Sequence, residues 1–204
     1  MFEFLAPIIG AISNLLPSII KIVGTGIERF ANALTAFFKV LGALEPEEDA
    51  KQLGDKALQA EELKPEQFDT YEQYLKEVEA YELDIEKSKL STDEQKLEKG
   101  IELMTGLALE RYGDLMEQFL IIMANKNEYF NERRMEAFAE IVKDDQDAIG
   151  KVVGYIEGHE KNTDKNDEGF DALVTVEKNV SPDTPESEVW KKIIDLRDLK
   201  EPKD

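Results

Sequence analysis

Cysteine is absent from this sequence of 204 residues, and histidine and tryptophan each occur once, as His159 and Trp190. Without cysteine the chain forms no disulfide, and thiolate catalysis and cysteine-ligated metal sites are excluded. A single histidine leaves little material for a Ser-His-Asp triad or a histidine-based metal site. The sequence also contains no nucleophile elbow and no phosphate-binding glycine loop. It therefore predicts no catalytic residue, metal ligand or cofactor, and a protein that is not an enzyme.

Positive charge is scarce. The chain has 25 basic and 45 acidic residues, a net charge of −20. Residues 1–44 contain three basic and two acidic side chains, or +1, so the other 160 residues carry −21. A body this acidic repels the phosphates of nucleic acids and anionic lipids, so we expect no nucleic-acid partner. The acidic residues are best interpreted as a solvated surface around a core that 204 residues are long enough to form.

The first 44 residues contain an apolar segment that has no charged side chain from Phe4 to Ile20. Its large side chains recur in steps of three and four, which places them on one stripe of an α-helix, and the opposite face is small or polar. Pro17 predicts a kink or a new helix start, and Gly24 with Gly26 marks a second weak point. The candidate partner or membrane contacts on the stripe are Leu5, Ile8, Ile9, Ile12, Leu15, Leu16, Ile19, Ile20, Val23, Ile27, Phe30, Leu34, Phe37 and Phe38.

Several roles are open to this segment. A secretory signal peptide is disfavoured because Glu3 stands where a basic region belongs. Residues 4–23 match the roughly 20 residues needed to cross a bilayer, but Ser13 and Asn14 make one face polar, which suits several helices together better than one alone. An in-plane membrane helix would carry basic residues before Lys21. The remaining interpretation is packing on the chain's own body, on copies of itself or on a larger assembly.

Residues 45–159 predict an acidic helical bundle with short turns. Ser91 with Glu94 matches a capping box, and the long helix that it starts ends in a run apolar on all sides, 119–123, which predicts deep burial. Residues 125–127 are interpreted as a short break. The expected helices cover about 50–63, which should be thin and exposed, 68–85, 93–123, 129–142 and 145–156.

Residues 160–204 predict a polar loop followed by a C-terminal helix. Residues 160–169 have loop composition, and 170–176 is the one stretch with strand-like composition. Thr184, Pro185 and Glu186 form a helix-start signal, and the helix that follows carries Trp190. We expect this to be a docking helix, with Trp190 as an anchor in the body rather than a partner contact.

Three further patterns suggest chemistry, but a simpler interpretation is preferred for each. Residues 164–169 resemble the start of an EF-hand loop, but Thr175 stands where the bidentate carboxylate belongs, so a polar loop is expected. Glu132, Glu136 and Glu140 share one helix face, but the Glu-x-x-His pairs of a di-metal bundle are missing. His159 lies at a predicted helix end between acids, where it is expected to cap the helix.

The sequence thus predicts an all-α protein: a long, kinked, apolar N-terminal helix (1–44), an acidic helical bundle (45–159) and a C-terminal docking helix (160–204). The functional hypothesis is a non-enzymatic structural or assembly protein. Its N-terminal helix would pack against itself or other helical proteins in an oligomer or a larger particle, such as a virion or secretion apparatus. The alternative is a membrane-anchored or membrane-inserting protein that uses residues 1–44. No compartment is predicted beyond such a particle or a membrane.

Overall fold

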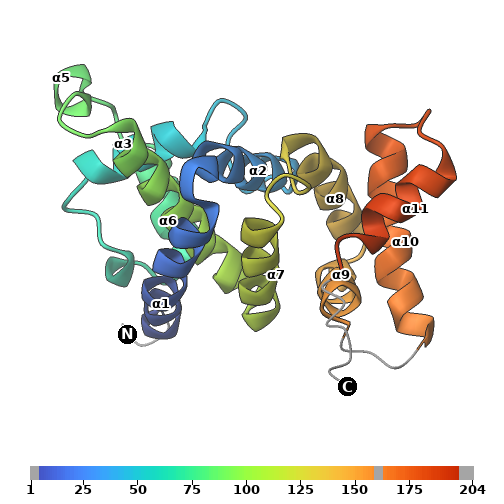
Figure 1. Ribbon diagram of the computed structural model, residues 1–204. Helices are drawn as coiled ribbons and strands as arrows, with labels where there is room; N and C mark the ends of the chain where they lie inside the picture. The colour runs from blue at the N-terminus through green and yellow to red at the C-terminus, as the bar shows by residue number, and fades with distance from the viewer. Residues whose placement is uncertain (1–4, 159–162, 198–204) are drawn as a thin grey trace.

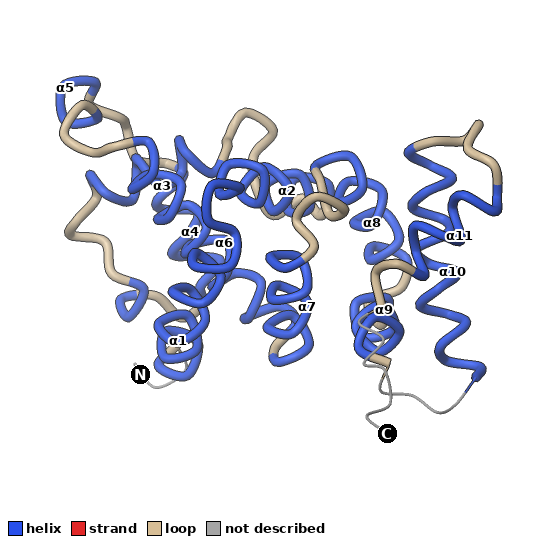
Figure 2. Tube along the Cα trace, viewed as in Figure 1, coloured by secondary structure: helices blue, strands red, loops and turns tan. Residues whose placement is uncertain are grey.

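The computed structural model describes residues 5–158 and 163–197, and every regular element in them is helical (Figures 1 and 2). The predicted all-α class is therefore confirmed. The elements in chain order are α1 (Ala6–Val23), η1 (Gly24–Gly26), α2 (Ile27–Val40), α3 (Ala50–Gln59), η2 (Pro65–Gln67), α4 (Tyr71–Glu79), α5 (Ile85–Ser88), α6 (Asp93–Tyr112), α7 (Asp114–Asn125), α8 (Glu132–Asp144), α9 (Ala148–Glu157), α10 (Thr163–Val180) and α11 (Glu186–Ile194).

The apolar side chains of α1 and α2 belong to the same buried cluster as those of the bundle. Helix α6 packs against α1, α2, α3, α4 and α7, which makes it the central element. Four fully buried phenylalanines join α2, α7 and α8: the rings of Phe37 and Phe138 stack at 6.2 Å, Phe119 lies 5.2 Å from Phe138, and Phe38 lies 5.3 Å from Phe37. The N-terminal segment is thus held by burial of large aromatic area.

Pro17 does not begin a new helix, which was one of the two outcomes predicted for it. Helix α1 continues through it, since Pro17 and Ser13 lie on the exposed face, where water can satisfy the carbonyl group that the proline leaves free. The chain bends at η1, at the second predicted weak point, where Gly24 has φ +48°, a conformation that glycine adopts without strain. Figure 1 shows α1 and α2 running in clearly different directions on either side of this turn.

Helix α3 is buried against α6 rather than thin and exposed, which corrects the prediction for 50–63. A Cβ atom on Gly54 would lie 1.8 Å from the carbonyl oxygen of Lys96, and one on Gly100 would lie 1.9 Å from that of Ala50. Two glycines facing each other's helix backbones therefore allow an approach that no other residue would permit. With few large side chains available, α3 gains its burial from this close contact.

Two boundaries of the central helix also differ from the prediction. The cap is Thr92, whose side chain accepts from the Gln95 N–H while Gln95 accepts from the Thr92 N–H, so the capping box begins one residue later than Ser91. The expected continuous helix over 93–123 is divided at Gly113, which has φ +60°. The deep burial predicted for 119–123 is confirmed at all of these positions except Ile121, which is half-buried.

The predicted loop over 160–169 and the strand-like stretch over 170–176 are both wrong where the structure describes them, since α10 covers Thr163–Val180. The buried residues of α10 recur at helical spacing: Gly169, Leu173, Val176 and Glu177. This spacing is typical of a helix, but the β-branched residues in 170–176 suggested a strand instead. Residues 164–169 thus lie in a helix rather than an EF-hand-like loop. His159 lies outside the described residues.

Candidate functional site

The predicted N-terminal stripe is packed largely inside its own chain. Five of its fourteen residues are half-buried, namely Ile8, Ile9, Leu16, Ile20 and Ile27, and the other nine are buried in the common core. Helix α1 lies against α6 and α7. The centre of the stripe is therefore covered by the chain's own bundle, and contact with a partner stays a prediction for the half-buried edge.

An apolar groove runs along this edge of α1. The groove has a volume of about 220 Å³ and is lined by Ile9, Ile12, Ser13, Leu16, Pro17, Pro65, Tyr71 and Glu102; we call it the α1 groove. Tyr71 is buried at its base, and burial, assisted by the nearby Glu102 charge, raises the pKa of the Tyr71 phenol well above its usual range. The one carboxylate in the lining, Glu102, is paired with Lys99 at 2.6 Å. The groove thus presents mainly aliphatic surface.

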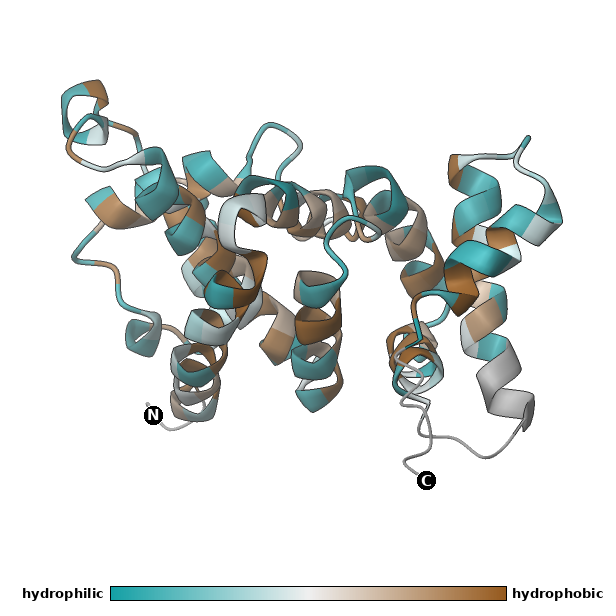
Figure 3. Cartoon of the chain, viewed as in Figure 1, coloured by the Kyte–Doolittle hydropathy of each residue, from teal (hydrophilic) through white to brown (hydrophobic). Residues whose placement is uncertain are grey.

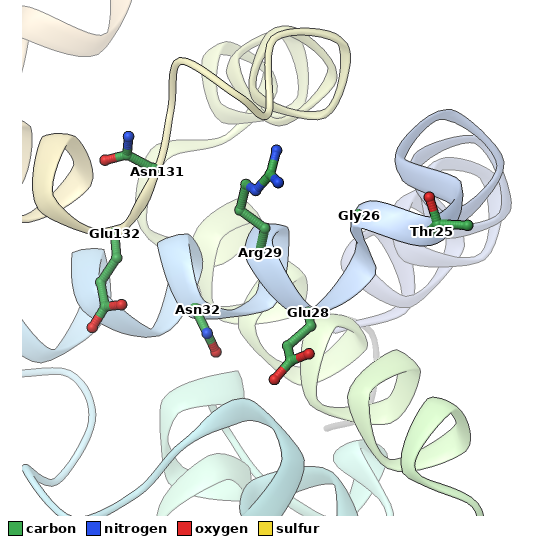
Figure 4. Close-up of a pocket in the computed structure, with 7 residues that line it drawn as sticks. All are labelled: Thr25, Gly26, Glu28, Arg29, Asn32, Asn131 and Glu132. Atoms are coloured by element: carbon green, nitrogen blue, oxygen red, sulfur yellow. The ribbon is translucent and has the colours of Figure 1, made fainter.

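A second pocket, of about 400 Å³, is polar and lies where η1 and α2 meet the loop before α8. Figure 4 shows its lining residues: Thr25, Gly26, Glu28, Arg29, Asn32, Asn131 and Glu132. The polar side chains do not converge, because Arg29 points to one side of α2 while Glu28 and Asn32 point to the other (Figure 4). An active site requires catalytic groups that meet at one reacting atom, and this pocket lacks that arrangement.

Beside α8, a third pocket is lined by Arg133, Glu136 and Glu140, among others. Glu140 pairs with Lys143 at 3.3 Å, so one of the pocket's two carboxylates already has an ionic partner. Within the part of the chain that the structure describes, no group of three or more metal-binding side chains comes together. Of the glutamates predicted to share one face of α8, Glu136 and Glu140 line this pocket, whereas Glu132 lines the pocket beside η1.

Buried charges occur where α3 meets α6. The Lys96 ammonium lies 2.9 Å from Asp55, and both side chains are about 8% exposed. Ser88 donates a hydrogen bond to Asp55 and accepts one from Lys96 at 2.8 Å, and Gln59 donates to Asp55 at 3.0 Å. Burial alone would raise the pKa of Asp55, but the hydrogen bonds from Ser88, Lys96 and Gln59 outweigh it and lower the pKa. Because the polar atoms in this cluster satisfy one another, we interpret it as structural.

A second charged cluster joins α8, α10 and α11. Glu177 is fully buried, accepts from Arg134 at 2.5 and 3.3 Å, and lies 3.6 Å from Lys192. Burial opposes its ionisation, yet the hydrogen bonds and charge of Arg134 lower the pKa of Glu177 below its ordinary value. The Arg134 guanidinium also lies 4.6 Å from the centre of the Tyr129 ring. This cluster ties the C-terminal helices to the body.

Trp190 contacts the body less than expected for an anchor. Its ring meets Phe170 edge-on at 6.1 Å, but the residue is 45% exposed, and Val189 and Ile193 are the buried residues of α11. Sequence reasoning also missed the most exposed large apolar residues among those described, Ile85 at 74% and Leu90 at 83%. Ile85 fits the helical spacing of the preceding stripe, so its exposure left no signal in the pattern.

No protein-family model matches this chain, and neither curated proteins nor solved structures gave a match.

Proposed function

We propose that this protein is a non-enzymatic helical assembly protein that binds a second copy or another helical protein through the α1 groove. The observation that supports this is the groove itself, an open aliphatic depression formed by the half-buried edge of the most apolar helix. Exposed apolar surface of this kind typically marks an interaction site.

The dimensions of the α1 groove favour a protein side chain as its occupant. Ligand sites for drug-sized molecules occupy roughly 300–1,000 Å³ and carry a few converging polar groups. The α1 groove has a volume of about 220 Å³ and one carboxylate, which already has a partner. It would accommodate one or two aliphatic side chains, as in the contact between an apolar anchor and a groove. A multi-subunit particle, such as a virion or secretion apparatus, would use such a contact repeatedly.

Membrane insertion is the second candidate function. Among the described residues, one helical stretch, Ala6–Val40, is long and apolar enough to cross a membrane by length and composition. The core helix of a soluble protein meets the same criteria, and α1 here buries Ile12, Leu15, Ile19 and Val23 in the chain's own core. Insertion would require these four side chains to leave the bundle, so it ranks behind assembly.

Sedimentation of the purified full chain tests the proposal. We expect a defined oligomer, and we expect Ile9→Asp with Leu16→Asp to weaken association by about 100-fold or more, because a charge would be buried in an apolar contact. Asn14→Asp with Ser18→Asp is the matched control, since it adds the same charge to the exposed face of the same helix. Circular dichroism melting would verify that each variant remains folded.

A monomeric wild-type chain at about 100 μM, at which even a weak interface would be populated, would overturn the assembly proposal. Flotation with liposomes forms the other arm. If the chain floats with vesicles and α1 becomes accessible to protease or label, membrane insertion replaces assembly as the better proposal.

A further inference from the structure

The segment around α5 projects from the body and carries two apolar residues in water. Residues 84–91, which we call the α5 tip, include Ile85 and Leu90, exposed by 74% and 83%. Figure 1 shows α5 standing away from the other helices, and Figure 3 shows hydrophobic colour on this projecting turn. Scattered single apolar residues on a surface need no explanation, but two on one protruding turn form a candidate contact.

The α5 tip is held firmly at its base. Ser88 belongs to the buried cluster of Asp55 and Lys96. Beside it, the Asp84 backbone N–H donates to the Gln59 side chain at 2.9 Å, and the Asp84 carbonyl accepts from that side chain at 3.2 Å. The exposed residues are therefore presented on an ordered turn, which reduces the entropy lost on binding.

We propose that the α5 tip of one copy inserts Leu90 and Ile85 into the α1 groove of a second copy. This inference rests on the proposed function, because it names the occupant of the α1 groove. The two surfaces are complementary: one is a projecting apolar turn, and the other is an apolar depression of about 220 Å³.

Local charges permit this pairing. The α5 tip has two exposed lysines, Lys87 and Lys89, against two exposed acids, Asp84 and Glu86, so it carries no net charge. The Pro65 side of the α1 groove belongs to the segment 61–69, which has four exposed acids against one exposed lysine. A tip without net charge thus meets the negative rim with little local repulsion, although the two chains, each of net charge −20, repel each other over longer distances. Association should therefore strengthen as salt screens that repulsion.

The positions of the two surfaces favour a closed pair. Helices α5 and α1 both lie at the end of the molecule remote from α10 and α11 (Figure 1). A two-fold axis would then let each copy insert its tip into the other's groove, which doubles the contact. One tip alone would bury far less than the roughly 1,200–2,000 Å² typical of stable interfaces, so the doubled contact is the more stable arrangement.

Mixing variants tests the pairing. Leu90→Asp with Ile85→Asp removes the tip contact at exposed positions, where the fold should tolerate it. We expect it to weaken self-association by about 30-fold or more. Ile194→Asp, which removes another exposed apolar side chain on α11, should leave association unchanged. Mixing the tip variant with the Ile9→Asp, Leu16→Asp groove variant should give association stronger than that of either variant alone but weaker than that of the wild type, because the mixed pair has one intact tip in one intact groove.

The absence of native cysteine allows a direct proximity test. Chains with Leu90→Cys, mixed with chains with Leu16→Cys, should form a disulfide-linked product at twice 23.2 kDa faster than either chain alone. Such a bond requires Cβ atoms within about 3.5–4.5 Å. Asn14→Cys, on the exposed face of α1, is the control and should cross-link slowly.

The outcomes separate this inference from the proposed function. If the groove variant dissociates the oligomer while the tip variant does not, the assembly function stands and the tip is not the occupant. If mixed variants fail to associate and the Leu90–Leu16 cysteine pair cross-links no faster than the control, the inference is overturned. A wild-type chain that is monomeric at every salt concentration overturns both.

Discussion

Asp55→Asn would remove the negative charge that lies 2.9 Å from the buried ammonium of Lys96. The amide keeps nearly the shape of the carboxylate, so the variant tests charge rather than packing. Removing one partner of a buried ion pair typically costs about 3–5 kcal/mol, because the other charge stays buried without compensation. Lys96 has a long aliphatic stem that can carry its ammonium towards water, so we expect the lower part of this range, about 3 kcal/mol.

Urea and thermal unfolding, followed by circular dichroism, measure the loss. For a chain of this length about 3 kcal/mol corresponds to a decrease in melting temperature of roughly 6–12 °C. Glu86→Gln is the matched control, since it neutralises the carboxylate of an ion pair with Lys89 whose members are 80% and 65% exposed. Exposed pairs contribute about 0–1 kcal/mol, so this change should be small.

A double variant completes the test. Asp55→Asn with Lys96→Met removes both charges and should recover most of the lost stability, as replacing a buried pair by apolar groups often does. Two results would refute the reasoning: Asp55→Asn no more harmful than Glu86→Gln, or a double variant as unstable as the sum of its two single changes.

Three further predictions concern stability. Gly100→Ala should lower the free energy of unfolding by about 3 kcal/mol or more, because its Cβ would overlap the α3 backbone, whereas Gly10→Ala, in open space on α1, should raise it by about 0.4–1 kcal/mol in the same denaturant titration. Glu110→Gln should cost about 1–3 kcal/mol by the same measurement, because the carboxylate accepts from the first two backbone N–H groups of α4 at 2.6 and 2.9 Å. Because the pKa of Glu177 is lowered in the folded state, its carboxylate stabilises the fold above the unfolded pKa of about 4.3, and this contribution is lost as the pH falls through the folded pKa. Glu177→Gln should therefore flatten the acid side of a stability–pH profile.

The helical class followed from periodicity, since steps of three and four recur from Leu5 to Phe38 and again in α6. The predictions failed where tertiary contacts determine the burial or the boundaries of a helix. Nothing in the sequence pairs Gly54 with Gly100, because a close approach of two backbones depends on which helices meet, so the burial of α3 was hidden. Pro17 was misjudged because the cost of a proline depends on whether the freed carbonyl faces water.

The candidate site was only half predictable. The stripe identified α1 as the most apolar helix, and Leu16 at its edge lines the groove. A helical pattern cannot show which edge remains uncovered, since that depends on how far the segment at Pro65 lies from α1. The exposure of Leu90 could not be predicted either, because the sequence shows only that this residue is apolar, which is equally true of a buried leucine.

The order of contacts along the chain has a consequence during synthesis. Helix α1 buries its stripe against α6 and α7, and about 70 residues separate the end of α1 from the start of α6. At roughly 5–20 residues per second, ribosomes need about 4–14 s to make that intervening stretch. For this interval the stripe has no intramolecular cover, which makes the nascent chain a substrate for chaperones that shield exposed apolar helices.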